Sequence, residues 1–428
     1  MSLIVQKFGG SSVADADGVR RVARRVAETR NAGNQVVVVV SAMGDTTDDL
    51  LDLANEVARK PPARELDMLL TSGERISMAL LAMAISDLGV PAQSFTGSQA
   101  GMITDGAHGA AKLVEVSPLR VQEALDNDNV AIIAGFQGMN RSSKDITTLG
   151  RGGSDTTAVA LAAALKADVC EIYSDVDGVY SADPRIVPSA QKLDRVSSEE
   201  MLELAANGAK ILHLRCVEYA RRFNVPLHVR SSFTHNEGTW VLPSPDEILT
   251  PQKEIPLEQP LIAGIAHDRS QAKITIVGAP DHPGIASRIF RLLADSEVYV
   301  DMIVQNVSTG EHPLTDVSFT LDESQGTLAM NLLRAAEEKI GYTRLDYNSE
   351  VGKLSLVGAG MKTNTGVAFQ FFQALADANI NVDMISTSEV RISIVTSVDK
   401  LDEAVRAVHT AFDLDSSEEA TVYGGTGR

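Results

Sequence analysis

The sequence predicts an α/β domain, a mostly parallel sheet between helix layers, followed by two smaller α+β units. Apolar strands, small polar loops and amphipathic helices alternate over roughly the first 240 residues, as in α/β domains that bind ligands at the carboxyl ends of their strands. Beyond residue 260 the chain repeats itself: KITIVG at residues 273–278 returns as KLSLVG at residues 353–358. Two copies of one supersecondary unit indicate a duplicated small domain.

Composition narrows the class of protein. A length of 428 residues predicts two or three domains, and 44% hydrophobic with 22% charged residues is typical of globular proteins. The net charge, 38 − 57 = −19, argues against a nucleic-acid or acidic-membrane partner. Cys170 and Cys216 form no CxxC pair, so neither a zinc site nor a disulfide scaffold is expected. The longest uncharged apolar run, residues 158–165, is far short of the ~20 residues of a membrane span, and we expect a cytoplasmic protein.

The first strand, residues 3–5, leads into Lys7 and then into Gly9, Gly10 and Ser11. A helix follows, with an apolar stripe at the spacing of a core-facing surface. A lysine at the end of a buried strand, just before two glycines, lies where a phosphate meets both an ammonium group and free N–H groups.

The next strand is a run of five valines, residues 36–40, which predicts burial on both faces of a parallel sheet. It ends in the polar loop 41–47, which leads to an amphipathic, leucine-bearing helix. A long helical stretch through residue 88 then contains Glu74 beside Gly73, where a glycine costs about 1 kcal/mol relative to alanine. Glu74 is either half of a surface Glu–Arg pair on a kinked helix or a carboxylate available to an ammonium group.

The stretch TTLGRGGSDTTA, residues 147–158, predicts an anion cradle at a helix start. Glycines permit positive φ, Ser154 and Asp155 are N-cap types, and Arg151 offers a fork for a carboxylate. The motif is neither a Walker loop nor GxGxxG. Its alternative interpretation is a tight strand-to-helix turn without a ligand.

The strand 169–173 delivers an acidic loop that opens with Asp175 and Asp177. An EF-hand would require glycine at the sixth loop position, but Gly178 stands at the fourth. Magnesium is therefore expected only indirectly, sharing ligands with a substrate phosphate.

Five motifs in this order, KFGGSS, TSGERIS, GFQG, TLGRGGSDTTA and YSDVDGVYSADPR, resemble the aspartate kinases of the amino-acid kinase superfamily, of the actinobacterial type regulated by lysine and threonine. The repeats resemble the ferredoxin-like ACT domain, a βαββαβ module that binds amino acids. The resemblance implies an amino-acid kinase fold over residues 1–243, a proline-rich linker over 244–262, and ACT domains over 263–344 and 345–428.

The implied reaction moves the γ-phosphoryl group of ATP to the β-carboxylate of L-aspartate, giving 4-phospho-L-aspartate. This is the first step toward lysine, threonine, methionine and diaminopimelate. A carboxylate with a pKa near 4 is already ionised at neutral pH, so no general base is needed. Catalysis is then left to positioning and to charge neutralisation.

The resemblance assigns Lys7 to the phosphoryl group and Asp155 to orienting Lys7. Glu74 is expected to take the substrate ammonium and Arg151 a substrate carboxylate. The remaining aspartate positions are Ser41, Thr47, Gly152, Gly153 and Ser154. The phosphate cradle is Gly9, Gly10 and Ser11. The positions around ATP are Ser174, Asp175, Tyr180, Asp183, Arg185 and Lys210. Mg²⁺ is expected to be held mainly through the ATP phosphates, with no metal site of the protein's own.

The repeats imply feedback inhibition by lysine plus threonine, and assembly into a homo-oligomer or an α2β2 complex through the ACT domains. The first effector site is expected at Asp281, His282, Gly284, Ile285, Ala286, Asp301 and Gln305. The second is expected at Thr363, Asn381, Val382 and Glu389. Three alternatives stay open: a dimerisation module without a ligand, a non-catalytic amino-acid sensor, and another amino-acid or carbamate kinase.

Overall fold

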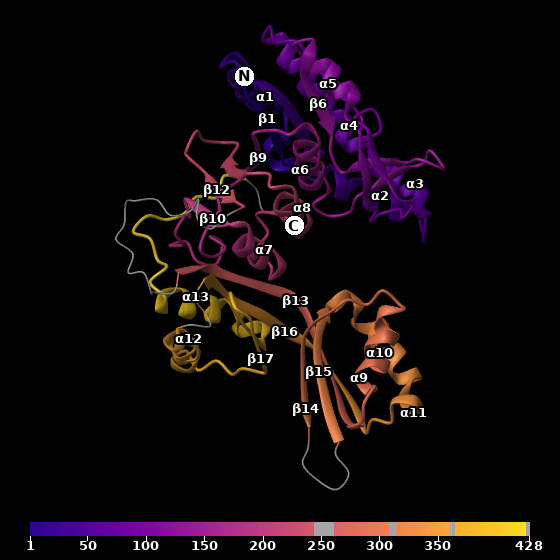
Figure 1. Ribbon diagram of the computed structural model, residues 1–428, viewed down its shortest axis with the longest axis vertical. Coiled ribbons are helices and arrows are strands. Elements are labelled where there is room, and N and C mark those ends of the chain that lie inside the picture. The colour runs from indigo at the N-terminus through magenta and orange to yellow at the C-terminus, as the bar shows by residue number, and fades with distance from the viewer. Residues whose placement is uncertain (244–260, 308–313, 360, 362–363, 425–428) are drawn as a thin grey trace.

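The computed structural model describes residues 1–243, 261–307, 314–359, 361 and 364–424. Residues 1–243 form an α/β part, at the top of Figure 1, and the remaining residues form a second part below it. The fold class predicted from the sequence is confirmed.

An eight-stranded sheet is the centre of the α/β part. Its strands, in spatial order, are β10 (Arg195–Ser197), β12 (Thr239–Leu242), β11 (Leu227–Ser231), β9 (Val169–Ser174), β1 (Leu3–Phe8), β2 (Gln35–Val40), β6 (Val130–Ala134) and β3 (Ala92–Phe95). All neighbours run parallel except β11 and β12. A second sheet beside it consists of β5 (Leu113–Val116), β4 (Met102–Thr104), β7 (Gln137–Asn140) and β8 (Ile146–Thr148).

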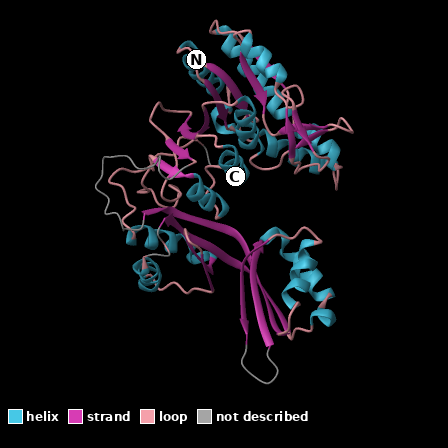
Figure 2. Ribbon diagram, in the orientation of Figure 1, coloured by secondary structure: helices cyan, strands magenta, loops and turns pink. Residues whose placement is uncertain are grey.

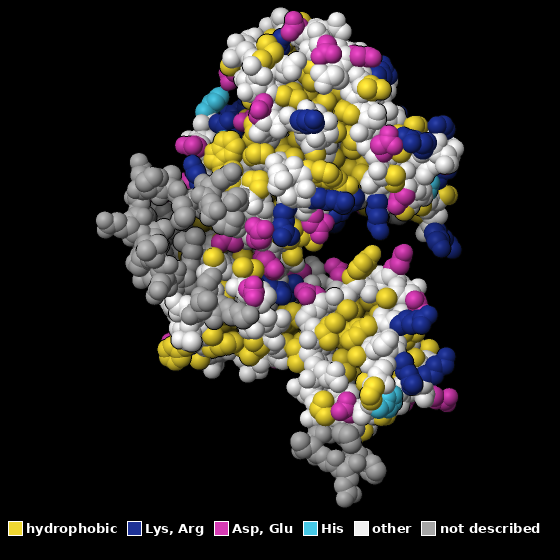
Figure 3. Space-filling view, in the orientation of Figure 1, with side chains coloured by type: hydrophobic (Ala, Val, Ile, Leu, Met, Phe, Trp, Pro, Cys, Tyr) yellow, Lys and Arg dark blue, Asp and Glu magenta, His cyan; other side chains and the backbone are white. Residues whose placement is uncertain are grey.

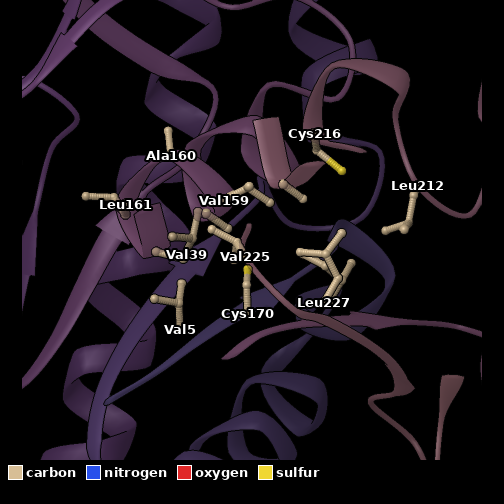
Figure 4. Packing of buried hydrophobic residues seen from close by; sticks show 14 of the residues in the cluster. Val5, Val39, Val159, Ala160, Leu161, Cys170, Leu212, Cys216, Val225 and Leu227 are labelled. Atoms are coloured by element: carbon tan, nitrogen blue, oxygen red, sulfur yellow. The ribbon is translucent and has the colours of Figure 1, made fainter. Parts of the chain in front are cut away.

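Helices cover both faces of the main sheet. One face carries α1 (Ala16–Asn31) and α4 (Ser72–Asp87). The other carries α5 (Leu119–Asp126), α6 (Gly153–Leu165), α7 (Ser198–Ala206) and α8 (Leu214–Phe223). The valines of β2 alternate between the two cores, so the strand is buried on both faces as predicted. Figure 4 shows the second core, in which the buried free thiols of Cys170 and Cys216 pack beside Val159.

Two helices differ from the sequence prediction. The predicted amphipathic helix is α2 (Thr46–Val57), but it has no buried residue, and Leu53 is 51% exposed. The predicted long helix is two helices, because α3 (Ala63–Leu70) ends at Thr71 before α4 begins. Among the described residues, the combined stretch Ala63–Asp87 is the one with a length and composition that would suit a membrane span. Its α4 packs on α1 and on the sheet through Met78, Leu81 and Ile85.

The second part is a single six-stranded sheet with helices on it (Figure 2). The strand order is β14 (Val300–Val307), β15 (Leu314–Asp322), β13 (Leu261–Pro280), β16 (Arg344–Ala359), β18 (Arg391–Ser397) and β17 (Met384–Thr387). Its helices are α9 (Ile285–Ala294), α10 (Glu323–Ala335), α11 (Glu337–Ile340), α12 (Thr365–Asp377) and α13 (Leu401–Ala411).

The two repeats share their longest strands. The C-terminal half of β13, from Gln271 on, pairs with β15 and with the start of β16. The N-terminal half of β13, residues 261–268, pairs instead with residues 353–359 of the second repeat. The first repeat is therefore inserted into the second, and the prediction of two successive units divided at residue 344 is wrong in this respect. Sequence order alone could not show this, because the pairing joins residues about 90 positions apart.

The second repeat also contacts the α/β part. Asn207, at the end of α7, accepts hydrogen bonds from Ser355 at 3.0 Å and from Arg391 at 2.9 Å. The chain after α13 then leaves this repeat and returns to the α/β part, where Tyr423 N–H donates to the carbonyl of Asp175 at 2.7 Å. Residues 415–424 are thus not part of the second repeat's sheet, in contrast to the predicted boundary at residue 428.

Candidate active site

Four parallel strands, β1, β2, β6 and β9, direct their carboxyl ends to one edge of the main sheet. The glycine turn after β1 lies against the loop after β2. A Cβ added at Gly10 would lie 2.9 Å from the Gly44 carbonyl oxygen and 3.0 Å from that of Ala42. Only glycine fits this approach. The short 3-10 turn η1 (Gly10–Val13) follows and carries Ser11.

Lys7 lies at the centre of this edge. Its Nζ is 3.5 Å from the position of a Cβ on Gly9, and 2.5 Å from Oδ1 of Asp155. Asp155 comes from the first turn of α6, where the helix dipole favours a negative charge. The side chains of Lys7 and Asp155 are 13% and 12% exposed. The structure thus brings the two predicted catalytic residues together in a partly dehydrated ion pair.

The predicted glycine-rich cradle forms the entry to α6, with one correction. The N-cap is Gly152, which has a φ of 69° and no side-chain capping bond. The prediction of Ser154 and Asp155 as N-cap residues is wrong, because both lie within the first helical turn. A Cβ at Gly152 would come within 2.1 Å of the His213 ring. Gly152 is therefore required both by its backbone conformation and by its neighbour.

Two residues that support this turn were missed from the sequence, namely His213 and Arg215. Arg215 Nη1 donates to the Leu149 carbonyl at 2.6 Å and so holds the strand end just before the turn. Both residues lie some 60 positions after the glycines, and no local pattern connects them. Arg151 is exposed, and within the described part of the chain it makes no ion pair, so its guanidinium is available to a ligand.

Glu74 is the unusual carboxylate of the site. It is 3% exposed, and Oε1 accepts a hydrogen bond from the Ala42 N–H at 3.2 Å. Its Oε2 is buried without a hydrogen-bond partner among the described residues. Burial raises the pKa of Glu74 to about 7. The interpretation as a surface Glu–Arg pair is therefore wrong. The arrangement suits a carboxylate that binds a cationic partner, beside the loop that holds Ser41 and leads to Thr47 in the first turn of α2.

Most of the candidate nucleotide residues lie at the end of β9 or on the loop after it, whereas Lys210 lies between α7 and α8. Arg185 contacts Asp175 at 3.1 Å and Asp183 at 3.8 Å, and Ser174 Oγ donates to Asp175 at 3.0 Å. Burial raises the pKa of Tyr180 to about 12, so its phenol stays protonated. Ser174, Asp175, Asp183 and Arg185 thus form one connected group. Lys210 is exposed, and no ion pair joins it to this group in the part of the chain that the structure describes.

Asp177 is a further residue that sequence reasoning left without a role. It is 8% exposed and accepts hydrogen bonds from Thr234 Oγ1 at 2.6 Å and from Asn236 Nδ2 at 3.2 Å. It ties the acidic loop to the loop after β11. Asp177 is thus a structural anchor between two loops. No group of three His, Cys, Asp or Glu side chains suited to a metal occurs among the described residues.

The predicted effector residues differ in exposure, and Ile285 is buried. Gly284, with a φ of 99°, is the N-cap of α9, preceded by Asp281 and exposed His282 and followed by Ile285 and Ala286. Gln305, Asn381 and Glu389 are exposed, and Val382 is half-buried. Thr363 lies outside the described residues.

Asp301 is already paired. Lys353 of the second repeat donates to it at 2.6 Å, and Lys273 of the first repeat lies 3.7 Å from Asp383 of the second. Burial opposes ionisation of Asp301, but the Lys353 ammonium overcomes it and lowers the pKa of the carboxyl group. Because Lys273 and Lys353, like Asp301 and Asp383, are equivalent in the duplication, the two ion pairs are reciprocal across the repeats.

Lys and Arg side chains, together with Asp and Glu side chains, border the hollow that separates the α/β part from the first repeat (Figure 3). The protein carries a net charge of −19, so an anionic substrate requires local positive groups such as Lys7 and Arg151.

Comparisons with known proteins agree with this geometry. Residues 2–231 match the amino acid kinase family, and residues 274–336 and 354–412 match the ACT domain. The chain is 59% identical over 428 residues to the aspartokinase of Mycolicibacterium smegmatis, and 58% identical over 428 residues to that of Corynebacterium glutamicum, covering 100% of each.

Solved structures add the arrangement of the parts. E. coli aspartokinase III in complex with aspartate and ADP (R-state) superimposes with a TM-score of 0.80 at 26% identity, over 96% of this chain and 100% of that one. Its complex with lysine and aspartate (T-state) gives 0.68 at 26% identity, over 95% and 99%. The chain therefore belongs to the aspartokinases, the ATP-dependent aspartate kinases of the amino acid kinase family.

Proposed function

We propose that the protein transfers the γ-phosphoryl group of ATP to the β-carboxylate of L-aspartate, giving 4-phospho-L-aspartate. This product opens the route to lysine, threonine, methionine and diaminopimelate. The observation that carries the proposal is the buried Oε2 of Glu74, which lacks a hydrogen-bond partner among the described residues. Glu74 contacts the loop after β2, at the same edge of the sheet as the Lys7–Asp155 pair. A buried carboxylate without a partner is costly, and an ammonium group in the substrate removes that cost.

Glu74, Arg151 and Lys7 each bind a substrate group of opposite charge. Glu74 receives the substrate ammonium, and exposed Arg151 grips a carboxylate with its planar fork. Lys7, held by Asp155, neutralises charge that develops on the transferred phosphoryl group. The glycine turn offers backbone N–H groups to the same phosphates. The acceptor is already ionised, so no residue has to remove a proton.

ATP would lie along the loop after β9, where Asp175, Asp183 and Arg185 are already connected. Mg²⁺ would be held chiefly through the phosphate oxygens, since the described residues offer no cage of carboxylates. The ion would shield charge between the phosphates and orient them.

We further infer regulation by lysine and threonine through the two ACT repeats. The repeats present non-identical exposed loops, which allows different ligand preferences. The structure superimposes better on the aspartate and ADP complex of the E. coli enzyme than on its lysine complex, with TM-scores of 0.80 and 0.68. An effector that favours the second arrangement would shift the equilibrium by its differential affinity.

Association through the repeats is part of the same proposal. The edge strand β14 presents Ile303 and Val307, which are 52% and 53% exposed. An uncovered apolar edge strand is a site for pairing with another sheet.

A coupled assay of ADP formation with aspartate, glutamate and N-acetylglutamate, each with ATP, tests the proposal. We expect activity with aspartate at least about 100-fold above that with the other two, because an extra methylene misplaces the carboxylate and acetylation removes the charge that Glu74 binds. Comparable rates with glutamate or acetylglutamate would instead assign the protein to another kinase of the family. No rate with any of the three would favour the non-catalytic sensor.

A further inference from the structure

The chain after α13 follows the acidic loop over most of its length. We call residues 413–424 the return segment and residues 174–191 the nucleotide loop. Ser416 N–H donates to the Ser189 carbonyl at 2.6 Å, Ala420 N–H to the Pro188 carbonyl at 2.8 Å, and Tyr423 N–H to the Asp175 carbonyl at 2.7 Å. Isolated antiparallel bridges pair Ala190 with Asp415 and Val176 with Val422. The return segment thus contacts both ends of the nucleotide loop.

A buried polar cluster fixes the start of the return segment. Ser181 Oγ lies 2.8 Å from His409 Nε2, and His409 Nδ1 lies 3.2 Å from Asp415 Oδ1. Burial lowers the pKa of His409, so the ring is neutral. The geometry then requires Nδ1–H to donate to Asp415 and Nε2 to accept from Ser181. Ser–His–Asp contacts of this kind occur in hydrolases, but Ser181 and His409 are both fully buried, so no substrate can reach them.

The nucleotide loop is also part of the second repeat's hydrophobic core. Ala182, Val187 and Ala190 pack in the same cluster as Val408 of α13 and Leu414 of the return segment. Movement of α13 cannot leave the loop unchanged, because close-packed interiors transmit displacement. The second repeat and the nucleotide loop therefore form one packed unit.

Tyr423 fixes the other end of the return segment. Its hydroxyl donates to Asp177 Oδ2 at 3.0 Å, and its ring stacks on Phe233 with centroids 6.0 Å apart. Burial and the Asp177 carboxylate raise the pKa of Tyr423, so the phenol keeps its proton. Gly424 then reaches the cradle: a Cβ there would lie 2.7 Å from Asp175 Cβ and 3.3 Å from Ser11 Cβ.

We propose that the return segment is a positioning element of the nucleotide site, and that Tyr423 is its key residue. Tyr423 holds Asp177 and the backbone of Asp175 in place, and thereby sets the affinity for ATP without contributing to aspartate binding. The same segment links α13 of the second repeat to the nucleotide loop. This inference rests on the proposed function, since it assumes that the loop binds ATP.

The test compares full-length Tyr423→Ala and Tyr423→Phe with the parent. The control is Tyr299→Ala, at a residue of the first repeat that is 76% exposed. We expect Tyr423→Ala to raise the KM for ATP about tenfold, the effect of losing a hydrogen bond to a charged group. The KM for aspartate and kcat should stay within about twofold of the parent. Tyr423→Phe keeps the ring stack, so its KM for ATP should lie between that of the parent and that of Tyr423→Ala. The control should have the same kinetic constants as the parent.

Hydrogen exchange provides a second readout that a merely structural role would not move. Adding ADP should slow exchange at the amides of Ser416, Ala420 and Tyr423 in the parent, because these amides bond to the nucleotide loop. ADP should protect them less in Tyr423→Phe. If Tyr423→Ala does not fold, Tyr423→Phe and the exchange measurement still decide.

An unchanged KM for ATP in both Tyr423 variants would overturn the inference. A lower KM for ATP or a higher kcat in Tyr423→Ala would also overturn it, and would show that the segment restrains the enzyme. An equal rise in both KM values would indicate a general structural role and overturn it as well. If the parent itself neither binds ADP nor phosphorylates aspartate, the proposed function fails first, which separates the two failures.

Discussion

Replacing Glu74 with glutamine should make the protein more stable and a poorer enzyme. The buried carboxyl group has its pKa raised from 4.5 to about 7, because its charged form is poorly solvated. A rise of that size corresponds to about 3 kcal/mol of unfolding free energy. Glutamine has the same shape and can still accept the Ala42 hydrogen bond, but it carries no charge.

The direction of the change in stability with pH follows from the protons that the folded and unfolded states bind. Between pH 4.5 and about 7 the folded protein holds a proton on Glu74 that the unfolded chain has released. The free energy of unfolding therefore falls as the pH rises through this window. Glu74→Gln removes this dependence. The variant should match the parent near pH 4.5 and exceed it by up to about 3 kcal/mol at pH 8.

Activity should move in the opposite direction. A hydrogen bond between a carboxylate and an ammonium group contributes about 1.5–3 kcal/mol, so the KM for aspartate should rise about 10-fold to 150-fold in Glu74→Gln. The KM for ATP should change little. Steady-state kinetics and urea unfolding at pH 5 and pH 8 measure both effects. Glu123→Gln, at an exposed position on α5, is the matched control.

Two results would refute the reasoning. A variant less stable than the parent at pH 8 would mean that the Glu74 carboxylate is satisfied in the free protein. A KM for aspartate within twofold of the parent, or an equal change in the KM for ATP, would mean that Glu74 does not receive the ammonium group.

Lys7→Ala should lower kcat at least about 100-fold, because one charge-stabilising contact is lost. Circular dichroism should show little loss of secondary structure. Activity within tenfold of the parent would contradict this prediction. Gly152→Ala should lower the Tm by more than Gly33→Ala does. Both glycines have a positive φ, but only an alanine at position 152 would clash with the His213 ring. Equal decreases in Tm would show that backbone strain alone matters. Lysine plus threonine should inhibit far more than either alone, and Gln305→Ala should relieve this without lowering uninhibited activity. Asp301→Ala should relieve it too but also lower the Tm, since its buried lysine partner loses its counter-charge. Simple additivity of the effectors, or variants as inhibitable as the parent, would make the first repeat structural.

Much of the α/β part followed from local sequence. The valine run of β2 and the glycine turn after β1 each carry their signal within a few residues, and both were predicted correctly. The alternation of strands and helices predicts that such turns meet at one edge of a parallel sheet. The contact between Lys7 and Asp155 itself was expected only from the resemblance to aspartate kinases.

The features that could not be predicted depend on long-range contacts. Glu74 is buried where it accepts a hydrogen bond from Ala42, 32 positions away, and helix periodicity does not report such a contact. The N-cap at Gly152 is set by its αL conformation, although Ser154 and Asp155 are better cap residues by type. The division of β13 between two repeats depends on strand pairing, which is not encoded at any single position.

Because the first repeat is inserted into the second, the second repeat lies between the first repeat and the kinase part. Asp268 pairs with Lys353 and Gln271 with Val351, so the chain enters and leaves the first repeat at adjacent points of an antiparallel ladder. A two-residue turn can join such strands. A chain with residues 270–350 replaced by a turn would therefore keep every strand and helix of the second repeat. The kinase part is attached directly to the second repeat, so a signal from the first repeat must pass through the second, either along that ladder or through the ion pairs Asp301–Lys353 and Lys273–Asp383.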